Sequence, residues 1–291
     1  MSNSIGDAGG IRVAPESTYG VAGTAFAVQH AMSATLAPSI PLLDIPCLGV
    51  ANPATREYGV SSVPGDMTLC YNDSRAVIGD ILAAGGNLST DTYTFGAGTA
   101  PDTASLTAWI DHGGTWAMQY LGCVVVGLRW EFQPNSSVQL TVTYLGKSFA
   151  SQTPVTLTPP SETGIIWDSD LGTTSVGGTT LGFLSGTIDV QFPVVGEDRH
   201  TLGATGILQP VVAGRAVVTC TLNVELNDAT GLDSEAVLTQ FYSGASLGSI
   251  VLGDWTLSNC WMTGDSPALG AGVTQFPINA TGSTLAVVTQ A

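Results

Sequence analysis

A glycine-flanked serine at residues 244–248, Gly-Ala-Ser-Leu-Gly, matches the G-x-S-x-G pattern that carries the nucleophile of many serine hydrolases. In those enzymes a strand precedes the serine, a helix follows it, and the catalytic histidine comes later in the chain. Here a helical pattern precedes Ser246 and a strand pattern follows it. The three histidines all come earlier: His30, His112 and His200. We therefore interpret Gly244 as a residue that ends a helix.

The other residue types that could do chemistry are scattered. Asp111-His112 is followed by two glycines, which indicates a turn rather than a general base. Asp168-Ser169-Asp170 and the pair Glu225 and Asp228 lack the oxygen spacing of a calcium loop, and the histidines form no zinc motif. The sequence thus predicts no catalytic residue, metal ligand or cofactor, and we expect no enzyme. A carboxylate pair for glycoside hydrolysis would be recognisable only in the fold.

Charge argues against nucleic-acid recognition. The 291 residues include 7 Lys and Arg against 23 Asp and Glu, a formal net charge of −16, and the single lysine is Lys147. Affinity for phosphates depends on Lys and Arg that release counterions, so specific DNA or RNA binding is not expected. Apolar content of 44% is ample for a core, whereas only 10% of the residues are charged. The surface must therefore consist mainly of small polar residues.

The cysteines and the N-terminus indicate the compartment. Five cysteines without a CxxC pair are expected to be reduced thiols in the core: Cys47, Cys70, Cys123, Cys220 and Cys260. Residues 1–10 have neither the basic nor the apolar region of a secretory signal. No run approaches the roughly 18 apolar residues of a membrane helix. We expect synthesis and folding in a cytoplasm and no membrane partner.

The element around which the chain is organised is a long β-hairpin over residues 121–147. Apolar and polar residues alternate with period two on both sides of a five-residue turn at 133–137. Closing this turn predicts four apolar cross-strand pairs, which are Phe132 with Val138, Trp130 with Leu140, Leu128 with Val142, and Val126 with Tyr144. A slip of one residue would move the whole apolar set to the other face, so the register is strongly specified.

The second half repeats this pattern. Residues 187–192 and 218–226 alternate in the same way, and Ser234-Glu235-Ala236-Val237-Leu238 resembles Ser74-Arg75-Ala76-Val77-Ile78, 160 residues earlier. Each of these segments predicts a short helix that glycines end. The fold class expected is all-β with short helices, in two duplicated β-sandwich or barrel units that each pack one helix. The expected division is an extended arm at 1–36, a first unit at 37–157, a linker at 158–170 and a second unit at 171–291.

Three stretches carry a resemblance to a known family. They are Arg12-Val13-Ala14-Pro15-Glu16-Ser17-Thr18-Tyr19-Gly20, the hairpin that begins Leu121-Gly122-Cys123-Val124-Val125 and ends Tyr144-Leu145-Gly146-Lys147, and the series Thr187-Ile188-Asp189-Val190, Leu202-Gly203 and Val218-Thr219-Cys220-Thr221-Leu222. The chain resembles the major tail, or tail tube, proteins of long-tailed, non-contractile bacteriophages. The resemblance implies a structural protein of the virion tail whose hairpins join those of neighbours into stacked rings around a channel.

The resemblance also implies partners. These are copies of the chain itself, a tape-measure protein in the channel, and the tail terminator and distal tail proteins, while DNA passes through without specific binding. Because such rings are commonly sixfold, a duplicated chain predicts a trimeric, pseudo-sixfold ring rather than a hexamer. The polar strand faces supply the candidate channel-lining residues, namely Arg129, Glu131, Thr187, Asp189, Gln191, Thr219, Thr221, Asn223 and Glu225.

Two other classes of protein share this composition. A capsid decoration or surface-fibre subunit would also be rich in Gly, Thr and Ser and built from β-strands. A carbohydrate-binding β-sandwich is a further alternative, although the six tryptophans mostly lie in strand patterns that indicate core. Hollow tubes, discrete knobs or a carboxylate-lined cleft would distinguish these functions.

Overall fold

The structure is a computed structural model. It describes residues 10–36, 42–45, 55–58, 62–96, 102, 105–111, 116–195, 207–212, 214–225, 234–263 and 275–290. Almost all regular elements in these ranges are strands, and every strand pairing between them is antiparallel. The expected all-β class with short helices is therefore confirmed.

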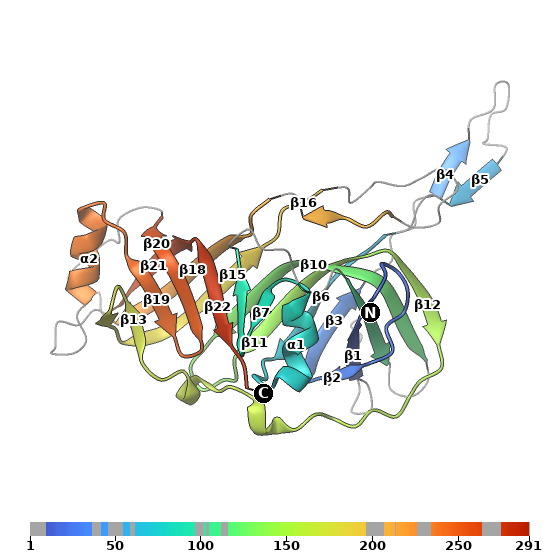
Figure 1. The fold of residues 1–291 in the computed structure, drawn as a ribbon, viewed down its shortest axis with the longest axis horizontal. Coiled ribbons are helices and arrows are strands. Elements are labelled where there is room, and N and C mark those ends of the chain that lie inside the picture. Colours follow the sequence, from blue (N-terminus) through green and yellow to red (C-terminus); the bar gives the residue numbers. More distant parts are fainter. Residues whose placement is uncertain are drawn as a thin grey trace.

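A central sheet runs through both halves of the chain (Figure 1). Its strands, in spatial order, are β3 (Ala31–Leu36), β6 (Val63–Cys70), β11 (Gln139–Gly146), β10 (Ala117–Phe132), β15 (Phe183–Gln191), β18 (Val217–Glu225), β21 (Gln275–Gly282) and the end of β20 (Trp255–Met262). The joint between the halves is the pairing of β10 with β15. The two halves therefore share one sheet.

Two smaller sheets flank the central one. The first contains β2 (Ala27–Gln29), β1 (Gly10–Pro15), β9 (Leu106–Asp111), the start of β10, and β12 (Ser148–Gln152). The second contains β7 (Asn87–Ser89), β8 (Thr92–Phe95), β22 (Thr284–Val288), the start of β20, β19 (Gly248–Leu252), β13 (Thr174–Val176) and β14 (Thr179–Thr180). Strands β10 and β20 each pass from a flanking sheet into the central one.

Two hairpins lie outside these sheets. They are β4 (Leu42–Ile45) with β5 (Thr55–Tyr58), and β16 (Val194–Val195) with β17 (Val211–Val212). The β4–β5 hairpin projects away from the rest of the molecule (Figure 1). Each hairpin is inserted between two neighbouring strands of the central sheet, the first between β3 and β6 and the second between β15 and β18.

The predicted register of the long hairpin is confirmed at its centre and wrong at its base. Trp130 lies opposite Leu140, and Leu128 lies opposite Val142. A β-bulge between Val125 and Gly127 then shifts the pairing, so that Tyr144 lies opposite Val125 rather than Val126. A bulge adds one residue to one strand only, which alternation by itself cannot reveal. The bulge lies where β10 passes from the first flanking sheet into the central sheet.

Both predicted helices are present, α1 (Arg75–Ala83) and α2 (Ser234–Tyr242), together with two short 3-10 turns, η1 (Glu162–Gly164) and η2 (Asp168–Asp170). In α1 the apolar residues Ile78, Ile81 and Leu82 are buried. Gly244 has a φ of +66°, a left-handed conformation that glycine adopts without strain, and it follows the end of α2. The interpretation of Gly244 as a helix-ending residue is therefore confirmed.

The N-terminal segment differs from the extended arm expected over residues 1–36. Its described part, residues 10–36, forms β1, β2 and β3. Strand β1 lies between β2 and β9, and its Ile11 and Val13 are fully buried. The segment expected as a linker, 158–170, is likewise held in place. Asn72 Nδ2 donates to the Ser161 carbonyl at 3.0 Å, and the Val138 N–H donates to the Ile166 carbonyl at 2.8 Å.

A buried carboxylate fixes the turn after β1. Glu16 accepts hydrogen bonds from the hydroxyls of Ser105 and Thr107, at 2.7 and 2.9 Å, and from the N–H groups of Gly20 and Gly122, both at 2.8 Å. Gly122 has a φ of +66° at the irregularity where β10 bends. Four donors replace the water that Glu16 loses on burial, so the carboxylate ties β1 to β9 and β10.

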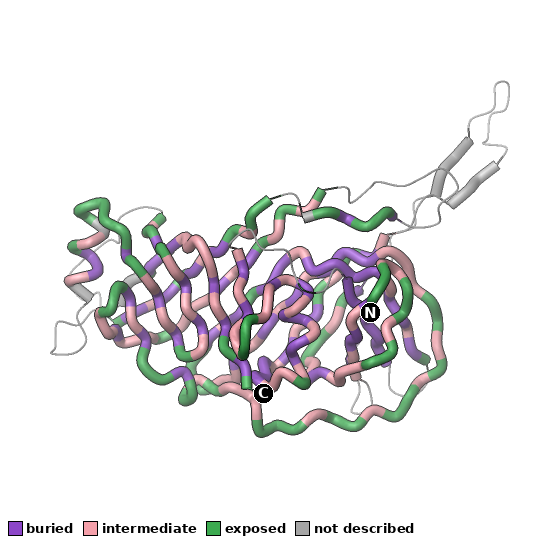
Figure 2. Tube along the Cα trace, in the orientation of Figure 1, coloured by how far each residue is buried: buried purple, intermediate pink, exposed green. Residues whose placement is uncertain are grey.

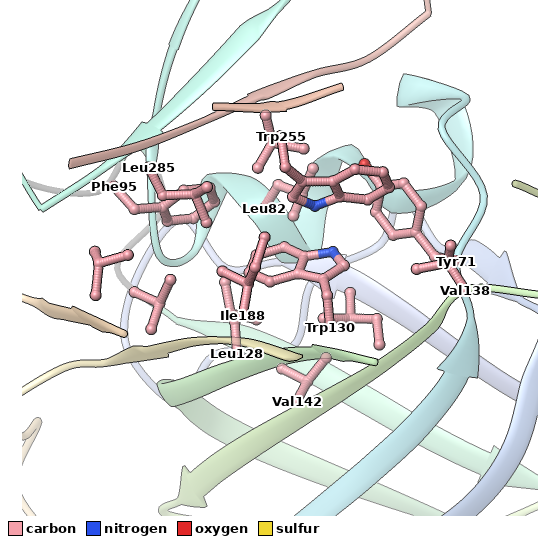
Figure 3. Packing of buried hydrophobic residues seen from close by; sticks show 14 of the residues in the cluster. Tyr71, Leu82, Phe95, Leu128, Trp130, Val138, Val142, Ile188, Trp255 and Leu285 are labelled. Atoms are coloured by element: carbon pink, nitrogen blue, oxygen red, sulfur yellow. The ribbon is translucent and has the colours of Figure 1, made fainter. Parts of the chain in front are cut away.

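One apolar core extends through both halves, as the buried segments in Figure 2 indicate. Trp255 from the second half packs against Phe132 and Tyr71 from the first half, with ring centroids 5.1 Å apart in both pairs. Figure 3 shows Trp130 and Trp255 within this cluster, beside Leu82 of α1. Aromatic contacts of this kind add to the burial of apolar area, so the halves stabilise each other.

Candidate functional site: the polar face of the central sheet

The nine residues singled out from the sequence lie on one face of the central sheet. Arg129 on β10 lies opposite Asp189 on β15, which lies opposite Thr219 on β18. The next row contains Glu131, Thr187 and Thr221. Gln191, Asn223 and Glu225 follow at two-residue steps and alternate with the buried Val190, Leu222 and Val224. Because side chains alternate along a strand, all nine point away from the core.

The same face includes polar residues that sequence reasoning missed. Hydrogen bonds join neighbouring strands across it: Thr143 to Asp66 at 2.7 Å, Thr68 to Thr141 at 3.2 Å, Asn223 to Ser185 at 2.9 Å and Thr221 to Asn279 at 3.0 Å. The alternation of Thr141 and Thr143 with apolar residues was a signal that could have found them. We call this surface, from β6 to β21, the polar face.

Charge on the polar face is negative with one neutralised cation. Arg129 is the only Lys or Arg in the described strands of the central sheet, whereas Asp66, Glu131, Asp189 and Glu225 are carboxylates. The Arg129 Nε lies 3.0 Å from Glu131 Oε1 and 3.8 Å from Asp189 Oδ1. Partial burial raises the pKa of Asp189, and the Arg129 charge opposes that rise. The arginine therefore already has two anionic partners.

The polar face has no feature of a reactive site. A shallow hollow of about 470 Å³ lies over it, lined by polar side chains that include Arg129, Glu131 and Thr187. Among the described residues, no group of three or more His, Cys, Asp or Glu side chains could hold a metal ion. The described cysteines are free thiols, and burial raises the pKa of Cys123 to about 12, so it remains protonated. Cys47 lies outside the described residues.

The central sheet ends in two margins. Strand β3 forms one margin, and within the described residues it pairs only with β6. The other margin is formed by β21 and the end of β20, where Trp261 is 53% exposed. Open strand edges are sites at which another chain can add to a sheet.

Neither described helix has the length and apolar character needed to cross a membrane.

A continuous sheet with a polar face, and with margins that no further strand of the described residues covers, suits a structural protein that works by assembly. The family model for phage tail tube proteins matches residues 6–282, and the chain belongs to this family. A search of the curated proteins found no match. The protein is therefore a non-enzymatic structural subunit of a phage tail tube and a component of the virion tail. This assignment decides against a capsid decoration or fibre subunit and against a carbohydrate-binding sandwich.

Proposed function

We propose that copies of this subunit form stacked rings in which the polar face lines a central channel through which DNA passes. One observation carries the proposal: the nine predicted residues lie together on one face of a sheet that spans the whole subunit. A sheet with an apolar side on the core and a hydrated side on a channel has the alternation that these strands display.

The chemistry of the polar face suits DNA that must move rather than bind. Retention of a phosphate backbone requires Lys or Arg side chains that are free to replace counterions. On this face Arg129 is already paired with Glu131 and Asp189, and the remaining charges are carboxylates. Hydroxyl and amide side chains such as Thr221 and Asn223 are hydrated and uncharged. The channel wall would thus offer few cationic side chains that could retain the phosphate backbone of DNA.

A duplicated architecture would follow from the order of the elements. In each half a strand pair encloses a hairpin and a helix follows. Six strands come next in the first half, β7–β12, and four in the second, β19–β22. Six strand pairings of the first half have a counterpart in the second. In the order first half and then second half they are β1–β9 and β13–β19, β3–β6 and β15–β18, β6–β11 and β18–β21, β9–β10 and β19–β20, β10–β11 and β20–β21, and β10–β12 and β20–β22. This recurrence supports two copies of one unit.

Local geometry supports the same duplication. Gly122 and Asn259 both have positive φ values, +66° and +51°, and each precedes a buried cysteine, Cys123 or Cys260. The hairpin β7–β8 lies between α1 and β9 and has no counterpart between α2 and β19, which follow each other closely. The two cysteines are separated by fewer residues than the two helices are. An insertion of the β7–β8 hairpin in the first half accounts for this difference.

Two units in one chain favour three chains in each ring, with six similar units around the channel. The subunit's partners are then other copies of itself within and between rings, a tape-measure protein in the channel, and the terminator and distal tail proteins at the tube ends. Electron microscopy of the purified protein tests the proposal. We expect hollow tubes with three chains per ring, and a count of six chains per ring or solid knobs without a bore would contradict it.

A further inference from the structure

The C-terminal segment joins two aspartates that belong to different halves of the chain. The Val288 N–H donates to the Asp254 carbonyl at 3.0 Å, and the Gln290 N–H donates to the Asp73 carbonyl at 2.9 Å. Asp254 lies in the turn between β19 and β20, whereas Asp73 lies between β6 and α1. One short stretch of backbone therefore holds an aspartate of each half.

Side chains meet at the same place. Tyr71, two residues before Asp73, packs its ring on that of Trp255, the residue after Asp254, with the centroids 5.1 Å apart. The charge of Asp254 acts on both Tyr71 and Asp73. We call Asp73 and Asp254 the aspartate pair.

One oxygen of the aspartate pair has no hydrogen-bond donor. Asp73 is 2% exposed, and its Oδ1 is buried without a partner. This atom lies 2.8 Å from the position that a Cβ atom on Gly164 would take, and the Oδ1 of Asn72 lies beside the same position. The nearest side chain there thus presents another oxygen. A buried carboxylate without donors is costly when charged, in contrast to Glu16 with its four donors.

The charges around the aspartate pair are negative. The titratable groups that act on Asp73, or on Tyr71 beside it, are Asp170 of η2, Asp254, and Tyr93 of β8. Among the described residues, no Lys, Arg or His charge acts on Asp73. Arg75 of α1 is bound to Asp91 instead, with 3.2 Å between Nη1 and Oδ1, and His30 Nε2 lies 3.1 Å from the Ser161 carbonyl. The pair therefore lacks a compensating cation.

This environment determines how the aspartate pair responds to pH. Burial, and then the Asp254 charge, raise the pKa of Asp73, while a hydrogen bond from the Gln290 side chain opposes the rise. Burial also raises the pKa of Asp254. The folded protein therefore keeps protons that the unfolded chain has already lost. The free energy of unfolding should rise as the pH falls through the raised pKa values, and this contribution is complete below the ordinary pKa of an unfolded aspartate.

We propose that the aspartate pair is a proton-dependent clamp between the two halves of the chain. Protonation removes the repulsion between the carboxylates and gives Asp73 an O–H group that can donate to the Oδ1 of Asn72. The C-terminal segment then holds the halves together more tightly at acidic pH, and the charged pair weakens the same contact at alkaline pH. The clamp belongs to the folded subunit, so it does not depend on the proposed rings.

Neutral variants of the aspartate pair test the clamp by urea unfolding of the full chain. Asp73→Asn and Asp254→Asn should each lower the equilibrium constant for unfolding at least about fivefold at pH 8, because the amide keeps the shape and removes the buried charge. The double variant should gain less than the product of the two effects, since both changes remove the same repulsion. All three gains should shrink between pH 8 and pH 5.

A charge-matched control accompanies these variants. Glu162→Gln removes one exposed negative charge in η1 and should change the equilibrium constant less than about twofold at either pH. The clamp is wrong if the single variants are no more stable than the wild type at pH 8, if their gains persist at pH 5, or if Glu162→Gln reproduces them.

The wild-type protein gives a second test that needs no variant. After correction for the intrinsic pH dependence, the amides of Val288 and Gln290 should exchange at least about fivefold more slowly at pH 5 than at pH 8. Amides of β12, an edge strand of the first flanking sheet, are the control and should not change. Equal protection of Val288 and Gln290 at both pH values would overturn the inference. Stabilisation by millimolar Ca²⁺ at pH 8 that Asp73→Asn abolishes would also overturn it, because a cation and not a proton would then neutralise the pair.

Discussion

Arg129 and Asp189 belong to different halves of the chain and lie directly opposite each other across the β10–β15 joint, with 3.8 Å between Nε and Oδ1. The arginine is also 3.0 Å from Glu131 on its own strand. This arrangement places the only Lys or Arg of the described central-sheet strands between two carboxylates. The side chain that supplies the only cationic charge of these strands therefore also makes a contact across the joint between the halves.

Removal of the arginine should cost more stability than removal of its partner. The Arg129 side chain is 48% exposed and the Asp189 side chain 25%, so water screens the pair, and Arg129→Met should lower the free energy of unfolding at pH 7 by only about 0.5–1 kcal/mol. Asp189→Asn should be close to neutral, because burial already raises the pKa of this carboxyl. Urea unfolding at pH 7 measures both, and a larger loss in Asp189→Asn would contradict this explanation.

The arginine variant should also respond to pH. Without Arg129 the folded-state pKa of Asp189 rises further above its unfolded value, so protonation favours the folded protein. Arg129→Met should therefore have a lower free energy of unfolding than the wild type at neutral pH. This difference should disappear as the pH falls through the raised pKa of Asp189. Urea midpoints of the variant and the wild type should converge on acidification, and a gap that stays constant down to pH 4 would exclude this cause.

The aromatic cluster shared by the two halves should dominate stability. Trp255→Ala removes the ring that packs on Phe132 and Tyr71 and should cost about 3–5 kcal/mol. Trp167→Ala is the matched control, because this tryptophan is 49% exposed, and it should change stability by less than about 0.5 kcal/mol. Thermal unfolding of the two variants provides the comparison. Similar melting temperatures would mean that Trp255 is not part of the core.

Glu16 should be one of the more costly carboxylates to neutralise. Glu16→Gln keeps the shape but replaces one acceptor oxygen by an NH₂ group that faces hydrogen-bond donors, with an expected loss of about 1–3 kcal/mol. Glu162→Gln, at an exposed position in η1, is the control and should be close to neutral. Chemical denaturation distinguishes the two, and a neutral Glu16→Gln would show that the four hydrogen bonds do not hold the turn.

A positive charge on the polar face should slow DNA passage. Thr221→Lys adds a free cation to an exposed position of β18, and Thr221→Gln adds a neutral side chain of similar length. Phage that carry the lysine variant should assemble tails but eject DNA more slowly, with the difference decreasing at high salt. Ejection kinetics equal to those of the glutamine variant would argue that this face does not line the channel.

Short-range patterns were enough to predict some of these features and not others. Period-two alternation placed Trp130 opposite Leu140, and a glycine after an apolar stripe located the end of α2 at Gly244. The pairing of Arg129 with Asp189 joins strands separated by a long connection, and no local signal specifies which strand edges meet. The bulge at Val126 and the burial of β1 depend on neighbours distant in the chain, so alternation could not reveal them.

The course of β10 has a mechanical consequence. One uninterrupted backbone runs from the first flanking sheet into the central sheet, and β20 does the same in the second half. Covalent bonds, and not only side-chain packing, therefore connect the central sheet to each flanking sheet. The central sheet therefore cannot shift relative to the flanking sheets. In the proposed tube, bending would then strain the contacts between rings, and the channel would keep its diameter.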